Sequence, residues 1–143
     1  KLNTETLVIP ADITKRGNAK SIVEKIIQKY GNLDIVINSA GVIQREKLIE
    51  DTSEEEIDNI TATNLNATIY IATAIARQFK KQNSGIYIVI SSQAGRIPFA
   101  FEAAYCGSKA GANQAIRCLD LEWAPKKNKP RKICGTNFKS RRT

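Results

Sequence analysis

Ser92, Tyr105 and Lys109 are residue types that can move a proton, and their spacing can bring them together. In the sequence they follow the pattern Ser-x12-Tyr-x3-Lys. If the stretch from Tyr105 to Glu122 is helical, residues four apart share a face, so the ammonium of Lys109 lies beside the phenol of Tyr105. An unperturbed tyrosine titrates near ~10, and a neighbouring cation lowers its pKa. The pattern therefore predicts a proton-exchanging phenol, with the Ser92 hydroxyl placed to hold a substrate oxygen.

A tyrosine and a lysine four residues apart also occur on many helices without any chemical role. Three further blocks precede them in the sequence and favour a functional interpretation. These blocks are Ala11-Asp12-Ile13-Thr14, Gly31-Asn32-Leu33-Asp34-Ile35-Val36-Ile37-Asn38-Ser39-Ala40-Gly41 and Thr63-Asn64-Leu65-Asn66-Ala67. With them, the chain from about Leu7 to Pro125 resembles the short-chain dehydrogenase/reductases. Ser39 departs from the pattern, because the family more often has a second asparagine there.

The resemblance implies an NAD(P)-dependent oxidoreductase that transfers a hydride between a nicotinamide cofactor and a small carbonyl or alcohol substrate. It implies that Tyr105 is the general acid/base and that Lys109 both lowers its pKa and holds the nicotinamide ribose. It also implies that Ser92 fixes the substrate oxygen and that Asn64 completes a proton path to the lysine. Tyr105 and Lys109 would therefore contact the cofactor, NAD or NADP, as well.

The resemblance implies a second set of cofactor-binding residues, namely Asp12, Ile13, Asn38, Ala40 and Gly41. In this interpretation Asp12 contacts the adenine, and the Asn38–Gly41 turn braces the sheet and forms a wall of the cofactor site. Simpler structural roles stay open for the same positions. Asp12 can cap the following helix, the turn can use glycine to relieve backbone strain, and Asn64 can satisfy buried polar groups.

Apolar periodicity predicts the elements that position these residues. We expect strands at Leu7–Ile9, Leu33–Ile37 and Gly85–Ile90, and helices from Ile22 to Tyr30, from Ser53 into the eighties and from Ala103 to Leu121. Strands that alternate with helices predict an α/β fold, here an incomplete Rossmann-like, doubly wound parallel sheet of three strands with flanking helices. Ligands of such sheets bind at the carboxyl ends of the strands, where most of the candidate residues fall.

The net charge of +8 is confined to one end of the chain. Residues 1–125 carry 14 basic and 14 acidic side chains, whereas residues 126–143 carry the other eight basic ones and no acid. We predict a partial dinucleotide-binding domain over residues 1–125 and a basic, disordered tail over residues 126–143. The tail could also contact polyanions, but no basic pattern with interleaved aromatics precedes it, so we expect no nucleic-acid partner.

Composition excludes several other classes of protein. The chain has no histidine and its three cysteines (Cys106, Cys118 and Cys134) lack metal-ligand spacing, which argues against Ser-His-Asp, Cys-His and metal chemistry. No segment is apolar enough to cross a membrane. Free cysteines and the absence of a signal-like start predict a cytoplasmic protein. Because members of the family commonly pair through long helices, the intact family member is a candidate homo-oligomer.

The chain begins at Lys1 and contains neither a methionine nor a Gly-x-x-x-Gly-x-Gly turn. We therefore expect a family domain without its first two strands, its pyrophosphate-binding turn and, after Pro125, its substrate-pocket region. The missing strands would lie between Leu7–Ile9 and Leu33–Ile37, which leaves a gap in the sheet. We expect the chain alone to be marginally stable and inactive. The alternative is a catalytically inactive fragment that acts, if at all, as an interaction module.

Overall fold

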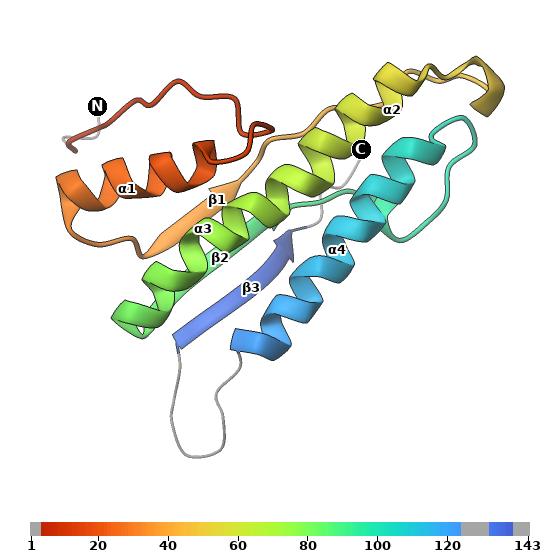
Figure 1. Ribbon diagram of the computed structural model, residues 1–143. Coiled ribbons are helices and arrows are strands. Elements are labelled where there is room, and N and C mark those ends of the chain that lie inside the picture. Colours follow the sequence, from red (N-terminus) through yellow and green to blue (C-terminus); the bar gives the residue numbers. More distant parts are fainter. Residues whose placement is uncertain (1–3, 124–131, 139–143) are drawn as a thin grey trace.

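Three parallel strands form the sheet of this protein. The computed structural model describes residues 4–123 and 132–138. In the described residues, strands β1 (Ile35–Asn38), β2 (Ser84–Ile90) and β3 (Lys132–Phe138) lie side by side in the order β1-β2-β3. Both pairings are parallel, and their register places Ile35 opposite Ile86 and Ser84 opposite Lys132. The α/β class and the incomplete parallel sheet predicted from the sequence are confirmed (Figure 1).

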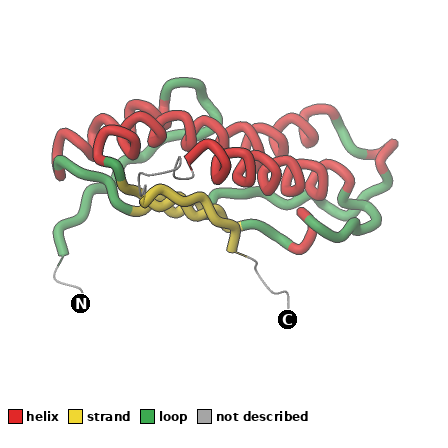
Figure 2. The backbone as a smooth tube through the Cα atoms, turned by 90° about the horizontal axis from the view of Figure 1, so that it is seen from below, coloured by secondary structure: helices red, strands yellow, loops and turns green. Residues whose placement is uncertain are grey.

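The helices lie on one face of the sheet, as Figure 2 shows. They are α1 (Asn18–Tyr30), α2 (Glu54–Thr61), α3 (Ala67–Gln82) and α4 (Ala103–Trp123), with two short 3₁₀ turns, η1 (Ile49–Asp51) and η3 (Gln93–Gly95). A π-helical turn, η2 (Ala62–Asn66), joins α2 to α3. Helix α1 packs on α3, and α4 lies against β3 and η3. The helices expected from periodicity are all present, whereas the π-helical turn was not predicted.

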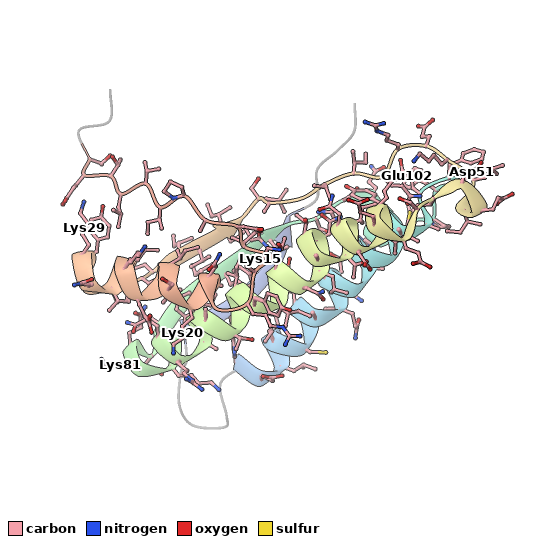
Figure 3. All side chains as sticks on the ribbon, turned by 45° about the horizontal axis from the view of Figure 1, so that its top comes forward. Lys15, Lys20, Lys29, Asp51, Lys81 and Glu102 are labelled. Atoms are coloured by element: carbon pink, nitrogen blue, oxygen red, sulfur yellow. The ribbon has the colours of Figure 1, made fainter. Side chains whose placement is uncertain are left out.

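The segment Leu7–Ile9 does not form a strand, so that prediction is wrong. The chain before α1 instead runs beside that helix, as Figure 3 shows around the labelled Lys29. The Nζ of Lys29 lies 2.8 Å from the carboxylate of Glu5 and donates to the carbonyl oxygen of Thr6 at 3.3 Å. An apolar run becomes a strand only where a neighbouring strand satisfies its backbone groups, and in the described residues β1 pairs on one side only, with β2.

Strand β3 lies in the region for which a disordered tail was predicted. Its backbone pairs with the full length of β2, so that prediction is wrong for these 7 residues. The rest of the expected tail lies outside the described residues. The charge of this segment does not predict a strand. Strands at the edge of a sheet tolerate lysines, and the pairing with β2 is a tertiary contact that the local sequence does not reveal.

The core lies between the helices and the face of the sheet that they cover. Its buried cluster consists of Leu33, Ala72, Ile75, Phe79, Tyr87, Val89, Ile116 and Trp123. The rings of Phe79 and Trp123 meet edge to face with centroids 6.0 Å apart, which ties the C-terminal ends of α3 and α4 together. Burial raises the pKa of the Tyr87 phenol, whose hydroxyl donates to the carbonyl oxygen of Thr68 at 3.0 Å. The same core therefore fixes β2 under both long helices.

Gly85 of β2 lies directly against the buried ring of Phe79, and a Cβ added there would overlap the ring carbons. We predict that Gly85→Ala lowers the free energy of unfolding by about 3 kcal/mol, because the ring has no space to move into. Urea unfolding measures the loss. The control is Gly107→Ala in α4, where an added Cβ meets nothing within 4 Å and alanine should stabilise the helix by about 0.5–1 kcal/mol. Equal stability of Gly85→Ala and the wild-type chain would contradict this packing.

The face of β1 and β2 opposite the helices carries five isoleucines. Because side chains alternate along a strand, Ile35, Ile37, Ile86, Ile88 and Ile90 point away from the helix-covered face. The exposed fractions of Ile35, Ile37 and Ile86 are 55%, 63% and 38%. Parallel sheets are normally covered on both faces, and within the described residues the helices lie on one face only. Ile35, Ile37 and Ile86 therefore form an exposed apolar surface, with Ile88 and Ile90 half-buried beside them.

We predict that this isoleucine surface binds hydrophobic dyes and makes the chain associate with itself. The double variant Ile37→Thr/Ile86→Thr keeps β-branched residues in the strands but removes apolar area, so dye fluorescence should fall roughly twofold or more. Because both positions are exposed, the free energy of unfolding should change by no more than about 0.5 kcal/mol for each. Ile97→Thr is the matched control, since Ile97 is 56% exposed but lies outside the sheet. An equal loss of dye binding in the control would count against the surface.

Candidate active site

The residues predicted to do chemistry lie on segments that meet at the carboxyl ends of β1 and β2. Residues 39–42 directly follow β1, and Ser91 and Ser92 directly follow β2. Tyr105 and Lys109 lie in the first two turns of α4, which packs against η3. The fold therefore delivers these residues to the edge of the sheet where parallel α/β proteins bind their ligands.

Lys109 and Tyr105 lie on the same buried face of α4, as their spacing predicts. The Nζ of Lys109 is 5.8 Å from the centroid of the Tyr105 ring. The exposed fractions of the two residues are 7% and 9%. Burial lowers the pKa of Lys109 below its ordinary value of 10.5, because the ammonium loses hydration. Its Nζ donates to the carbonyl oxygen of Ile90 at 3.5 Å, a long contact that leaves this cation weakly compensated.

Gly41 allows the loop after β1 to approach this lysine closely. A Cβ at Gly41 would lie 3.2 Å from both the Nζ of Lys109 and the Oδ1 of Asn64. A side chain at position 41 would therefore push against the ammonium. The glycine therefore serves this close approach, whereas the left-handed backbone that only glycine adopts easily is not found at position 41.

Asn64 lies in the π-helical turn η2 and is 2% exposed. Its Oδ1 accepts from the N–H of Val42 at 2.9 Å, and its Nδ2 donates to the carbonyl oxygen of Val42 at 2.9 Å and to the Oγ of Ser108 at 3.0 Å. The amide thus uses both of its donors to hold the loop after β1 against α4. These contacts match the structural role left open for Asn64, and π-helical turns often occur at functional sites.

Asn38 and Ala40 form a second brace beside the sheet. The Oδ1 of Asn38 accepts from the N–H of Ala40 at 3.2 Å, and its Nδ2 donates to the Oγ1 of Thr68 at 3.0 Å and lies 3.4 Å from the Tyr87 hydroxyl. Asn38 is 4% exposed. The turn after β1 is therefore tied both to α3 and to β2, as expected of a sheet brace.

Ser92 lies at the start of η3, where its Oγ accepts from the N–H of Ala94 at 3.2 Å. Its neighbour Ser91 donates to the Oδ1 of Asn113 at 2.6 Å, and the Nδ2 of Asn113 donates to the carbonyl oxygen of Gly95 at 3.1 Å. Asn113 thereby clamps the Ser92 segment onto α4, one turn after Lys109. Asn113 was not predicted from the sequence, although a lone amide on the apolar side of a helix is a signal that indicates such a role.

Asp12 and Ile13 lie in the segment before α1. The Oδ1 of Asp12 accepts from both the Oγ1 and the N–H of Thr14, at 2.6 and 2.9 Å, and these bonds lower the pKa of the carboxyl. The carbonyl oxygen of Asp12 also accepts from the Nδ2 of Asn18, the first residue of α1, at 2.8 Å. The carboxylate does not cap α1, whose N-cap is Gly17 without a side-chain hydrogen bond, so the helix-capping role left open for Asp12 is not observed. The cofactor role of Asp12 and Ile13 stays a prediction.

A groove of about 980 Å³ lies elsewhere, between α1 and α3. Val23, Ile27 and Ile69 supply part of its apolar lining, and it contains none of the predicted site residues. Among the residues whose side chains are described, no group of three or more His, Cys, Asp or Glu residues could hold a metal ion. Over the same part of the chain, every helix is too short or too polar to cross a bilayer. The predicted catalytic residues Asn64, Ser92, Tyr105 and Lys109 instead lie on the segments that meet at the strand ends.

The parallel α/β sheet is that of an incomplete Rossmann-like domain, and a buried tyrosine–lysine pair lies at its strand ends. Residues 1–141 match the family described as short chain dehydrogenase. The chain belongs to the short-chain dehydrogenases, a family of oxidoreductases, so the family inferred from the four sequence blocks is confirmed.

The chain is also similar to named proteins of this kind, both in sequence and in structure. An NAD-dependent glycerol dehydrogenase of Listeria innocua is 37% identical over 122 residues, which cover 85% of this chain and 48% of that protein. A 2-dehydro-3-deoxy-D-gluconate 5-dehydrogenase of Dickeya dadantii is 34% identical over 124 residues, covering 82% and 47%. The solved structure of a metagenomic short-chain oxidoreductase in complex with NADP has a TM-score of 0.81 at 25% identity, covering 90% of this chain and 56% of that one. The chain spans about half the length of the curated relatives it matches.

Proposed function

We propose that this chain carries the catalytic centre of an NAD(P)-dependent oxidoreductase that interconverts a carbonyl compound and an alcohol. The observation that supports this most strongly is the buried ammonium of Lys109, 5.8 Å from the ring of Tyr105 at the carboxyl ends of the strands. A desolvated cation beside a phenol is costly to bury and is the arrangement that proton transfer to a substrate oxygen requires. One of the relatives is named for NAD and one solved structure contains NADP, which supports a nicotinamide cofactor.

In this proposal each residue has a defined task. The Tyr105 phenol gives a proton to the substrate oxygen during reduction and takes it back during oxidation. The Ser92 hydroxyl oxygen accepts from the N–H of Ala94, which leaves its own proton to donate to the substrate oxygen and so orient the carbonyl. The ammonium of Lys109 favours negative charge on the phenol oxygen and holds a ribose hydroxyl. When bound, the nicotinamide supplies or accepts the hydride.

The residues at the strand ends fit the nicotinamide half of such a cofactor. Lys109 has three N–H donors and only a long contact to Ile90, so it can still donate to a hydroxyl. The bare backbone at Gly41 lets a ligand approach the loop after β1. Asn64 supports this surface by holding Val42 and Ser108, and a proton path through its side chain would use the remaining lone pair of Oδ1. Asp12 and Ile13 are proposed for the adenine end.

A segment exchange tests this function. The 122-residue stretch of the Listeria innocua relative that matches this chain is replaced by the chain's own sequence, which gives an exchange enzyme with the remaining half of the family domain. We expect it to bind NADH or NADPH and to oxidise the reduced cofactor when offered a panel of small carbonyl compounds. A folded exchange enzyme that binds cofactor but turns over no member of the panel would argue against the proposal. The 143-residue chain by itself should show no saturable binding of either cofactor.

A second candidate is a catalytically inactive member of the family that acts as an interaction module and pairs with a second copy of itself. The observation that favours it is the uncovered isoleucine surface, with Ile35 and Ile37 more than half exposed. Saturable cofactor binding and turnover by the exchange enzyme separate the two candidates. We also propose a cytoplasmic setting, which suits the free thiols of Cys106 and Cys118.

A further inference from the structure

A glutamine from the loop after β1 caps the helix that carries Tyr105. The Oε1 of Gln44 accepts from the N–H of Ala104 at 3.0 Å and from the N–H of Tyr105 at 3.2 Å. These are the second and third residues of α4, whose amides have no acceptor within the helix. Helix caps normally come from the residue next to the helix, whereas this acceptor lies about 60 residues earlier in the chain.

The orientation of the Gln44 amide follows from its partners. Two backbone N–H groups face one end of it, and only the oxygen can accept from both. The Nε2 at the other end donates to the Oγ1 of Thr52 at 3.2 Å, and Thr52 in turn donates to the carbonyl oxygen of Leu48 at 3.1 Å. Gln44 is 3% exposed and Thr52 9%. The glutamine is therefore held at both ends in a buried chain of hydrogen bonds.

The same short loop also controls the surroundings of Lys109. Gly41 approaches the Nζ of Lys109, Asn64 clamps Val42, and two residues later Gln44 binds the backbone of Tyr105. In Figure 3, Glu102 just before α4 and Asp51 in η1 lie at the same end of the molecule, so the cap joins the start of α4 to the region before α2. One loop thus binds the backbone of Tyr105 and passes close to the ammonium of Lys109.

We propose that Gln44 is a positioning residue that holds the first turn of α4, and with it Tyr105, in register with Lys109. The proposal rests on the proposed function for the role of Tyr105, but its structural content can be tested without any cofactor. Loss of the cap frees the amides of Ala104 and Tyr105 and lets the first turn fray, which moves the tyrosine ring while the rest of α4 stays anchored in the core through Ile116 and Trp123.

The experiment measures amide hydrogen exchange and aromatic NMR signals in the full chain and its variants. Gln44→Met keeps the size of the side chain but has no oxygen acceptor, and Gln44→Glu keeps the acceptor. We expect Gln44→Met to speed exchange at Ala104 and Tyr105 about fivefold to tenfold, the usual effect of a lost cap, and to leave Ala112 and Ile116 unchanged. The ring signals of Tyr105 should shift, whereas those of Tyr87 in the core should not.

Gln44→Glu keeps the acceptor for both amides but loses the donation to Thr52, so exchange at Ala104 and Tyr105 should be slower than in Gln44→Met and no faster than in Thr52→Val. Gln114→Ala is the matched control, because this glutamine lies exposed on the same helix and should change nothing at Tyr105. Thr52→Val removes the hydrogen bond that supports Gln44 but leaves the acceptor oxygen in place. Amide exchange at Ala104 and Tyr105 should therefore speed up less than in Gln44→Met. This variant provides the test if Gln44→Met does not fold.

Unchanged exchange at Ala104 and Tyr105 in both Gln44→Met and Thr52→Val would overturn the proposal. So would an equal acceleration at Ala112 and Ile116, which would show a general loss of stability, or exchange at Ala104 and Tyr105 in Gln44→Glu as fast as in Gln44→Met. Failure of the proposed function appears elsewhere, as an exchange enzyme without turnover, and leaves these amide measurements unaffected.

Discussion

Tyr105→Phe in the exchange enzyme is expected to lower kcat about 10³-fold, within the range that a lost general acid/base produces. The dissociation constant of the nicotinamide cofactor should stay within about twofold of the starting enzyme. Phenylalanine keeps the ring of this residue, which is only 9% exposed, and the backbone N–H of residue 105 still donates to Gln44. The substitution therefore removes the hydroxyl and leaves the site in place.

The measurement combines steady-state oxidation of the reduced cofactor with a fluorescence titration of cofactor binding. Tyr70→Phe is the matched control, because this tyrosine lies on α3 beside the groove with α1 and loses the same atom away from the site. Its kcat should not change. If Tyr105→Phe keeps more than about a tenth of the activity, the phenol is not the proton-transfer group, and the proposed mechanism fails even if the family is right.

The helices and the central strands were predictable because their signals are local. The apolar spacing before Gly31, the Ser53 cap and the continuous apolar run up to Ile90 each lie within one segment, and the structure has α1, α2 and β2 there. The pairing of Tyr105 with Lys109 was also predictable from local sequence, because two residues four apart on one helix share a face. Local periodicity therefore found both the elements and the chemical pair.

The features that were missed depend on distant parts of the chain. Leu7–Ile9 has the composition of a strand but lacks a partner, whereas Lys132–Phe138 has an unpromising charge pattern and finds one in β2. Gln44 is an isolated glutamine with no motif around it, and its role appears only when the loop after β1 meets α4. The π-helical turn around Asn64 is another case, since its amide is satisfied by Val42 and Ser108 from other elements.

Lys109→Met is expected to weaken catalysis and strengthen the fold at the same time. In the exchange enzyme, loss of the ammonium should lower kcat/KM about 10²-fold or more, because a preorganised charge next to the reacting oxygen is removed. In the chain alone, methionine fills a similar volume without a charge that must be desolvated, so the free energy of unfolding at neutral pH should rise by about 1 kcal/mol or more. The buried ammonium of Lys109 would thus lower the stability of the chain while supporting catalysis.

The difference in unfolding free energy between Lys109→Met and the wild-type chain should depend on pH, whereas a difference caused by packing alone should not. Burial lowers the pKa of Lys109 below 10.5 in the folded chain, so between the folded and unfolded values the unfolded chain binds more protons. The cost of the buried charge is present in full below the folded-state pKa and disappears as the pH rises through it toward 10.5. The stability advantage of Lys109→Met should therefore shrink as the pH rises. The raised pKa of Tyr87 acts in the opposite direction above its ordinary value of 10.0, but it is common to both chains and cancels in the difference. Urea unfolding of both chains across alkaline pH measures this gap, and a gap that stays constant would show that Lys109 carries no electrostatic cost in the fold.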